Sequence, residues 1–223
     1  MKRTLFLYPI VLLSSCSTDT KDNNNKPDIN LEVINKAEAD SMENEEEDIP
    51  TYRYDTLLKS GYKLRFKFND SAQLLILMHK DSLIRELSSV ERSELPKTLG
   101  YKAADFDNYF AFVKSFGSGN PHVLQIIKKE TGEVIRNGAW IDANEKKGYI
   151  LYSPKPIPQP GDSMVLINMN SMVEKKYEFP SDIFDGPEVL NRIKLKNVDS
   201  DGLSLEYFLE SKPQNLIVKR YNY

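Results

Sequence analysis

The chain is poor in the residue types that build metal, redox and disulfide sites. Its 223 residues include one cysteine, two histidines and one tryptophan. A single cysteine cannot close a disulfide within the chain, so a hydrophobic core must hold the fold together. The histidines, His79 and His122, are far apart in the sequence and fit no metal-ligand spacing such as HExxH or HxH. We therefore expect no cofactor and no resident metal.

The sequence also lacks a recognisable catalytic motif. Ser118 lies near His122, but there is no G-x-S-x-G elbow, and we interpret this segment as a hairpin loop. Asp105 and Asp107 are two acids that we expect in a solvated loop rather than in a glycosidase site. Residues 199–202 begin like a calcium loop, but no glutamate stands at the required later position, so we interpret them as a glycine-containing hairpin turn.

No apolar run is long enough to cross a membrane. The longest N-terminal run, residues 5–13, is interrupted only by Pro9 and follows the positive charges of Lys2 and Arg3. A bilayer-spanning helix needs roughly 20 apolar residues, so this pattern is typical of a secretory signal peptide rather than of an anchor.

The end of this segment carries the most specific motif of the chain. The run Leu13-Ser14-Ser15-Cys16 resembles the lipobox of bacterial lipoproteins. The resemblance implies cleavage before Cys16, a diacylglyceryl group on its thiol and acylation of the new N-terminus. It further implies an outer-membrane address, since residue 17 is serine rather than the aspartate of an inner-membrane retention signal. The composition is similar to that of lipoproteins from Bacteroidota, and the protein could face the periplasm or the cell surface.

Charge divides the exported chain into a tether and a domain. We assign residues 1–15 to the signal peptide, 16–50 to a lipidated N-terminus with an acidic disordered tether, and 51–223 to a single β-rich domain. Positions 17–50 hold eleven acidic residues and three lysines, a composition too polar and too charged to fold alone. A flexible chain of that length places the domain roughly 30 Å from the membrane. The remaining domain is close to neutral and has no polybasic run, which argues against a nucleic-acid partner.

Hydrophobic periodicity predicts an all-β domain. The segment 62–68 alternates apolar and cationic residues, as a half-buried strand does, and 203–209 alternates nearly as well. Denser apolar runs predict strands that are buried on both faces. These runs cover residues 74–78, 109–113, 123–127, 149–152 and 164–169.

Turn residues separate the predicted strands and indicate an antiparallel meander. We expect turns at 69–71, 80–81, 130–132, 137–138, 199–202 and 213–215, with the Asn-Gly pair at 137–138 suited to a type I′ hairpin. Short helices are expected only at 88–94 and 187–191. A β-sandwich or open barrel is the favoured architecture. A propeller-like arrangement of four units is the alternative, because similar strand patterns recur every 40 to 47 residues.

Two groups of residues are candidates for a ligand surface. Lys63, Arg65 and Lys67 form a cationic stripe that would suit an anionic glycan, a lipid headgroup or an acidic protein, although such stripes are more often solvated faces. Trp140, Tyr149 and Tyr152 could stack on a sugar, although packing in the core is the commoner role of such residues.

These features favour a non-enzymatic binding or assembly lipoprotein of the cell envelope. The expected partners are the membrane, through the lipid on Cys16, and an envelope protein or a glycan. Two alternatives remain open at this stage: an exported hydrolase that acts on glycan or peptide, and a lipoprotein that confers immunity to a toxin.

Overall fold

The computed structural model describes residues 55–93, 99–115, 122–186 and 188–222. Every described residue belongs to one compact unit, Glu47–Tyr223. The signal peptide, Cys16, the acidic tether and Ser118 lie outside the described residues. The predictions made for them therefore stay predictions.

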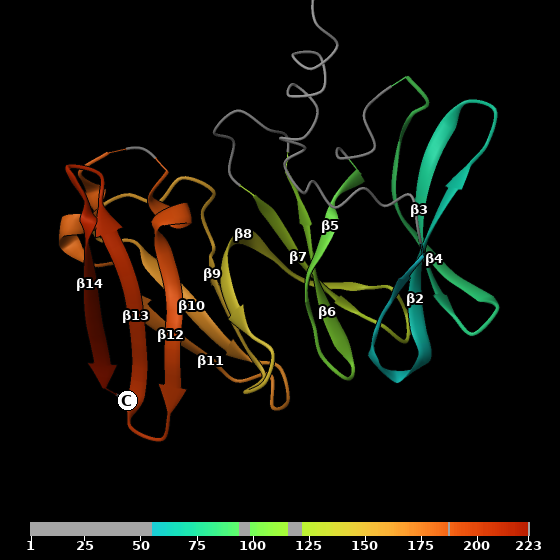
Figure 1. Cartoon of the computed structure of the whole chain (residues 1–223). Helices are drawn as coiled ribbons and strands as arrows, with labels where there is room; N and C mark the ends of the chain where they lie inside the picture. Colours follow the sequence, from blue (N-terminus) through green and yellow to red (C-terminus); the bar gives the residue numbers. More distant parts are fainter. Residues whose placement is uncertain (1–54, 94–98, 116–121, 187, 223) are drawn as a thin grey trace, which may run out of the picture. The chain divides into compact units, whose positions relative to one another are not determined.

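This unit is an all-β structure, which confirms the predicted fold class. Strands make up most of it, and the helical segments in its described part are short 3-10 turns. These are η1 (Lys59–Gly61), η3 (Ser181–Phe184) and η4 (Val189–Arg192). Every strand pair is antiparallel and joins strands that follow one another in the sequence, so the connections form the expected meander (Figure 1).

The first sheet has four strands in the order β1-β2-β3-β4. Their bounds are Thr56–Leu57, Tyr62–Phe68, Ala72–His79 and Ser82–Glu91. The predicted alternation of β2 holds only in part: Leu64 is fully buried and Lys67 is exposed, but Phe68, on the same face as Leu64, is 61% exposed. In contrast, β4 replaces the helix predicted at 88–94, because Ser88 is paired with Leu75 in the ladder between β3 and β4. Pairing across the sheet overrides the local helical preference there.

The second sheet has seven strands and curls into a half-barrel. Its strands are β5 (Tyr101–Asp105), β6 (Tyr109–Lys114), β7 (Val123–Lys128), β8 (Val134–Asn144), β9 (Tyr149–Ser153), β10 (Ser163–Asn168) and β11 (Glu174–Glu178). The curl agrees with the favoured open-barrel architecture. The propeller-like alternative is not observed, because these seven strands are hydrogen-bonded into one continuous sheet rather than divided into blades.

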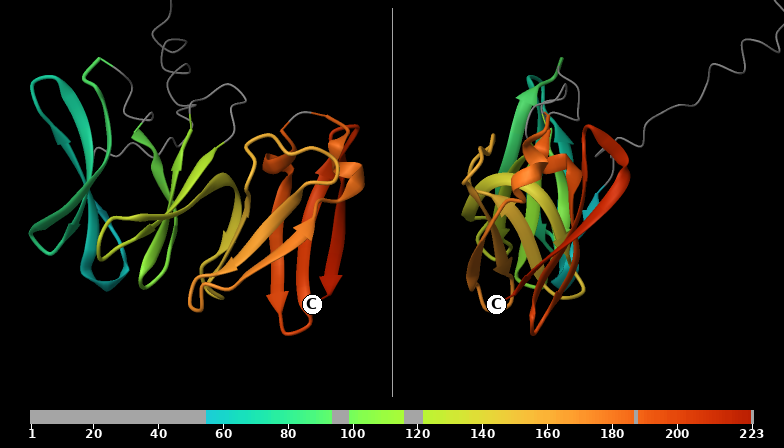
Figure 2. Two further views of the ribbon diagram at one scale, coloured as in Figure 1. Left: turned by 180° about the vertical axis from the view of Figure 1, so that it is seen from behind. Right: turned by 90° about the vertical axis from the view of Figure 1, so that its left-hand side faces the viewer.

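The third sheet has three strands in the order β12-β13-β14 (Figure 2). They span Ile193–Asp199, Gly202–Leu209 and Lys212–Asn222. The turn predicted at 213–215 is wrong, since these residues belong to β14 and the chain reverses at Glu210 and Ser211. Pro213 is tolerated because β14 is an edge strand, where a missing N–H disrupts no ladder on the open side.

The Asn-Gly turn predicted at 137–138 is also wrong, because both residues lie inside β8. Gly138 serves a different purpose there. A Cβ atom at this position would lie 2.5 Å from the main-chain oxygen of Ser153 and 2.6 Å from Cδ2 of Tyr152. The glycine therefore lets β9 and the Tyr152 ring approach the β8 backbone closely.

Three hydrophobic clusters hold the sheets together. One joins the first sheet to β6 and β7, and includes Leu64, Leu77, Phe110 and Phe112. A second covers one face of the seven-stranded sheet, and a third joins its other face to the third sheet. Neighbouring residues in a strand alternate between clusters: Phe110 and Phe112 belong to the first, whereas Ala111 belongs to the second. The dense apolar runs are thus strands buried on both faces, as predicted.

Candidate functional site

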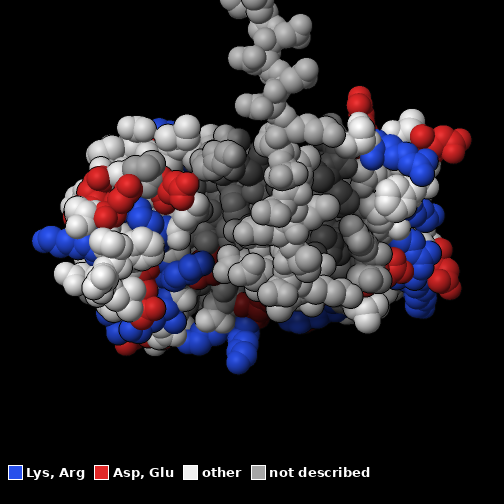
Figure 3. Space-filling view, turned by 45° about the horizontal axis from the view of Figure 1, so that its top comes forward, with Lys and Arg blue, Asp and Glu red and all other residues white. Residues whose placement is uncertain are grey.

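The predicted cationic stripe lies on one face of β2, but it is not an unopposed positive surface. Nη2 of Arg65 lies 3.0 Å from a carboxylate oxygen of Asp55, and Nζ of Lys63 lies 3.9 Å from Asp81. Of the three cations in the stripe, Lys67 alone has no ion pair with another described residue. On the face that Figure 3 shows, positive and negative described side chains are likewise interspersed. An anionic partner would therefore meet little net charge at the stripe.

The three aromatic candidates do not share a surface. Tyr152 is buried, and the partly buried Trp140 packs against the same cluster. Tyr149 contacts the cluster on the opposite face of the sheet. Their roles are therefore in the core, as the commoner interpretation predicted, and they do not form one sugar-stacking platform.

The two histidines are apart in the fold as well as in the sequence. The His122 ring lies beside Tyr101, with 3.0 Å between Nδ1 and the phenol oxygen. His79 ends β3 and stacks on the Tyr62 ring, with 4.4 Å between the ring centroids and 20° between the planes. No group of three or more His, Cys, Asp or Glu residues in the described segments could hold a metal ion.

The predicted calcium-loop candidate is a turn. One Asp199 carboxylate oxygen accepts hydrogen bonds from the main-chain N–H groups of Asp201 and Gly202, each at 3.0 Å. Arg220 lies 3.3 Å from Asp199 and 3.6 Å from Asp201. The carboxylates are thus used by the turn and by an arginine, which agrees with the interpretation as a hairpin.

The prediction of a solvated loop is wrong for Asp105, which is only 5% exposed. Its carboxylate lies 2.7 Å from Nζ of Lys129, a side chain that is 1% exposed. The other carboxylate oxygen accepts a hydrogen bond of 2.7 Å from the main-chain N–H of Lys59. Lys129 also donates a hydrogen bond of 3.1 Å to the main-chain oxygen of Lys59. One buried ion pair thus joins the η1 turn before β2 to β5 and to the turn after β7.

This arrangement has two opposing effects on the pKa of Lys129. Burial lowers the pKa of its ammonium group, and the hydrogen bond that it donates to Asp105 opposes that effect. Nζ also lies 5.8 Å from the centroid of the Tyr62 ring, within the range of a cation–π contact. Because Lys129 is buried and already bonded, it is a structural cation rather than an accessible nucleophile.

A surface cavity of about 480 Å³ lies over this ion pair. It is formed where the first sheet meets the turns of the seven-stranded sheet. Its lining is mainly polar and aromatic and consists of Ser60, Tyr62, His79, Asp107, Asn108, Tyr109, Lys128, Lys129 and Glu130. We call it the seam cavity. It is the candidate functional site.

Main-chain and side-chain hydrogen bonds fix the walls of the seam cavity. The N–H of Lys129 donates to the main-chain oxygen of Asn108 at 2.9 Å, which holds the β5–β6 and β7–β8 turns together. Ser60 donates through Oγ to the main-chain oxygen of Asp107 at 3.3 Å, which ties η1 to the same turn. The exposed Asp107 and Asn108 side chains are therefore carried on a turn that is anchored at several points.

The charged groups of the lining are largely paired. Nζ of Lys128 lies 2.8 Å from Glu130. A hydrogen bond within this pair raises the pKa of Lys128 and lowers the pKa of Glu130, so both are charged at neutral pH. The cavity can thus bind a small ligand by hydrogen bonds and ring contacts, and it presents no pair of free carboxylates for acid–base chemistry.

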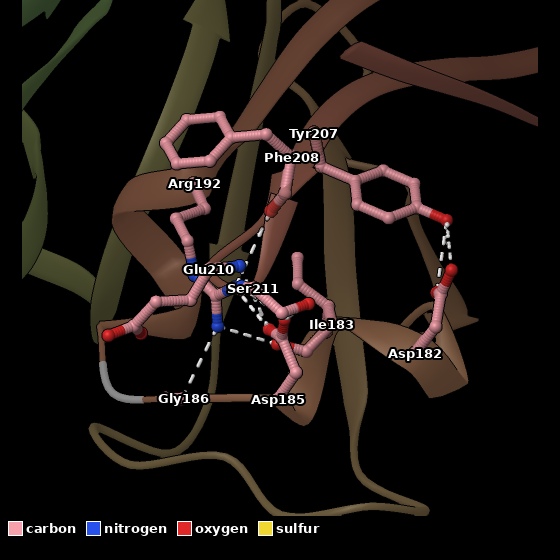
Figure 4. Close-up of polar contacts among 9 residues, drawn as sticks. All are labelled: Asp182, Ile183, Asp185, Gly186, Arg192, Tyr207, Phe208, Glu210 and Ser211. Atoms are coloured by element: carbon pink, nitrogen blue, oxygen red, sulfur yellow. Dashed lines mark hydrogen bonds and ion pairs between the residues drawn. The ribbon is translucent and has the colours of Figure 1, made fainter. Parts of the chain in front are cut away.

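A second polar cluster, shown in Figure 4, fastens the third sheet to the segment before it. Arg192 is buried and donates from Nη2 to the main-chain oxygen of Ile183 at 2.6 Å and from Nη1 to Asp185 at 2.6 Å. Asp185 also accepts hydrogen bonds from the N–H groups of Glu210 and Ser211. These bonds, above all the one from Ser211, hold the pKa of Asp185 far below its usual range. Both carboxylate oxygens of Asp185 accept hydrogen bonds within the protein, so we regard this cluster as structural.

The phenol of Tyr207 in the same region is also structural. Its hydroxyl donates to Asp182 at 3.0 Å. Burial, helped by that carboxylate, raises the pKa of Tyr207 to about 12. A phenol that stays neutral and bonded at physiological pH serves here as a link between β13 and η3.

No sequence pattern predicted the seam cavity. Lys128, Lys129 and Glu130 stand together next to a turn, a composition that normally indicates solvent exposure. Asp105 and Lys59 are 46 residues apart, and Lys129 and Lys59 are 70 residues apart. Only the packing of the first sheet on the second brings these groups together.

Comparison with known proteins does not assign the chain to a family. No family model matches the chain, and no curated protein matches it. Within the described residues, no helix has both the length and the apolar composition needed to cross a bilayer.

Proposed function

We propose that the protein is a lipid-anchored binding module of the cell envelope that holds a small ligand in the seam cavity without transforming it. The observation that carries this proposal is the construction of the cavity. Three turns from two sheets are fixed around a buried ion pair and present polar and aromatic groups to solvent. Small-molecule sites are typically preformed concave surfaces of this kind, with a few polar groups in fixed positions.

The alternative of an exported hydrolase is less well supported by this site. A glycosidase needs two carboxyl groups that face one substrate bond. Of the two acids near the cavity on strand β5 and its turn, Asp105 is buried and bonded to Lys129 and Lys59, whereas Asp107 is exposed. Asp105 therefore suits a structural role, and Asp107 suits contact with a ligand.

The anchor is proposed from the lipobox and has its own test. Full-length protein expressed in a bacterium that lipidates exported proteins should incorporate a clickable fatty acid and sediment with membranes. The Cys16→Ser variant should do neither. A Cys16→Ser variant that still sediments with membranes and still carries the label would refute the proposed anchor.

The binding role is tested by blocking the cavity. Asn108→Trp places a large ring at the cavity wall, whereas Asp70→Trp places one in the exposed β2–β3 turn, away from the cavity. Full-length protein in detergent is incubated with a whole-envelope extract, and the retained compounds are identified by mass spectrometry. We expect a compound that the wild type and Asp70→Trp retain and that Asn108→Trp does not. Equal retention by all three proteins, or by none, would contradict the proposal.

A further inference from the structure

The seam cavity also indicates which class of ligand it binds, provided that the binding role proposed above is correct. Its charges are nearly balanced by internal pairing. Lys129 is paired with Asp105 at 2.7 Å and Lys128 with Glu130 at 2.8 Å, so each cation of the lining already has a carboxylate. Asp107 is the remaining charged group of the lining, and its side chain is exposed.

This balance disfavours three classes of ligand. An anion would have to displace Glu130 or Asp105 from its lysine, and it would face the charge of Asp107. A cation would find one exposed carboxylate, which attracts it only weakly in water. A purely apolar ligand would remove water from Ser60, Asn108 and the charged groups without replacing their hydrogen bonds.

The groups that remain suit an uncharged ligand rich in hydroxyl groups. Asp107 accepts hydrogen bonds only, and the amide of Asn108 both donates and accepts them. Ser60 and the two tyrosines add hydroxyl groups to the same lining. Tyr109, which is partly buried against the second cluster, and the stacked Tyr62–His79 pair add ring atoms to the lining that C–H groups can contact. The volume of about 480 Å³ lies within the range of small-molecule sites, roughly 300 to 1,000 Å³.

We propose that the seam cavity binds a neutral saccharide, with Asp107 and Asn108 bonded to sugar hydroxyls and the ring of Tyr109 against the sugar face. The buried Lys129–Asp105 pair contributes indirectly, because it fixes the turn that carries these two side chains. The saccharide class follows from the pairing of the cavity's own charges and from the hydroxyl, amide and ring groups left available.

The test compares ligand classes and matched variants. Full-length protein in detergent is applied to an array that carries neutral glycans, sulfated and sialylated glycans, and short peptides. The best neutral glycan is then titrated by calorimetry into the wild type, Asp107→Ala and Asp70→Ala. Both variants remove an exposed turn carboxylate, but only Asp107 lines the cavity. We expect binding of neutral glycans, about tenfold weaker in Asp107→Ala and unchanged in Asp70→Ala.

Each other outcome has a distinct meaning. Selective binding of peptides or anionic glycans that Asn108→Trp abolishes would refute the saccharide class and leave the proposed binding role intact. Binding of neutral glycans that neither Asp107→Ala nor Asn108→Trp weakens would refute the assignment to this cavity. If no neutral glycan binds at all, the saccharide proposal is wrong, and the envelope-extract experiment then decides separately whether the cavity binds anything.

Discussion

At the scale of single residues, the buried ammonium group of Lys129 has the largest consequences. An unpaired charge in the protein interior is very costly, and a buried pair is retained only when its geometry and hydrogen bonds are good. Nζ of Lys129 and the Asp105 carboxylate lie 2.7 Å apart, and each also makes a hydrogen bond to a main-chain group of Lys59. The pair therefore links the η1 turn of the first sheet to β5 and to the turn after β7 in the second.

Removing one partner of this pair should be strongly destabilising. Lys129→Met leaves Asp105 buried without its cation, and we predict a loss of about 3 to 5 kcal/mol in the free energy of unfolding. Lys128→Met, which breaks an exposed pair one residue earlier, should change stability little. Urea unfolding followed by circular dichroism measures both variants. A Lys129→Met protein as stable as Lys128→Met would show that the pair does not hold the sheets together.

The hydrogen bonds to Asp185 should make the free energy of unfolding depend on pH in the acidic range. They lower the pKa of this carboxyl in the folded state, so the ionised form stabilises the fold at neutral pH. That contribution is present above the pKa of the unfolded chain and is lost as the pH falls below about 4. Asp185→Asn should therefore be less stable than the wild type at pH of about 6, and the difference should shrink toward pH of about 3. Unfolding measurements that give the same difference at both pH values would contradict this assignment.

At the scale of strands, the packing of β9 on β8 requires Gly138, which the sequence pattern predicted to lie in a turn. Gly138 leaves room for the Ser153 main chain and the Tyr152 ring, so an added methyl group must push β9 away. We predict that Gly138→Ala lowers the free energy of unfolding by about 1 to 3 kcal/mol. The neighbouring Asn137 is exposed, and Asn137→Ala should have a small effect. Thermal unfolding of the two variants checks this, and equal midpoints would be inconsistent with the close approach.

The strands themselves were predictable because their signals are local. Alternation in β2 and the unbroken apolar run of β6 follow directly from side chains that point to opposite faces of a sheet. The positions of the turns were less predictable. Asn137, Gly138 and Pro213 are residue types that favour turns, but they lie in strands. Their conformations are set by cross-strand neighbours, which local composition does not reveal.

The candidate site was not predictable for a related reason. The residues proposed from the sequence were chosen for charge and aromatic character, and the structure pairs Arg65 with Asp55 and buries Tyr152. The seam cavity instead combines residues from η1, from the end of β3 and from two turns of another sheet. None of these short segments has a motif of its own, and their proximity comes from the long-range packing of one hydrophobic cluster.

At the scale of the whole molecule, we propose a lipid anchor and an acidic tether that carry a β unit without disulfides. Positions 17–50 carry a net charge of −8, whereas the chain from residue 51 onward is mildly basic. A tethered binding module can search the volume near a membrane, because its linker limits how far it diffuses from the surface. The saccharide proposal then places a polyhydroxylated ligand within reach of the envelope to which the protein is attached.

Photo-crosslinking in living cells tests the central claim, ligand binding at the seam cavity of an envelope-anchored protein, most directly. A photoreactive amino acid is introduced at position 108, on the cavity wall, or at position 70, in the exposed turn away from it. Cells are irradiated, and the membrane-bound protein is analysed by mass spectrometry. We predict a saccharide adduct from position 108 and none from position 70. The same adducts from both positions, or none from position 108 in membrane-bound protein, would contradict it.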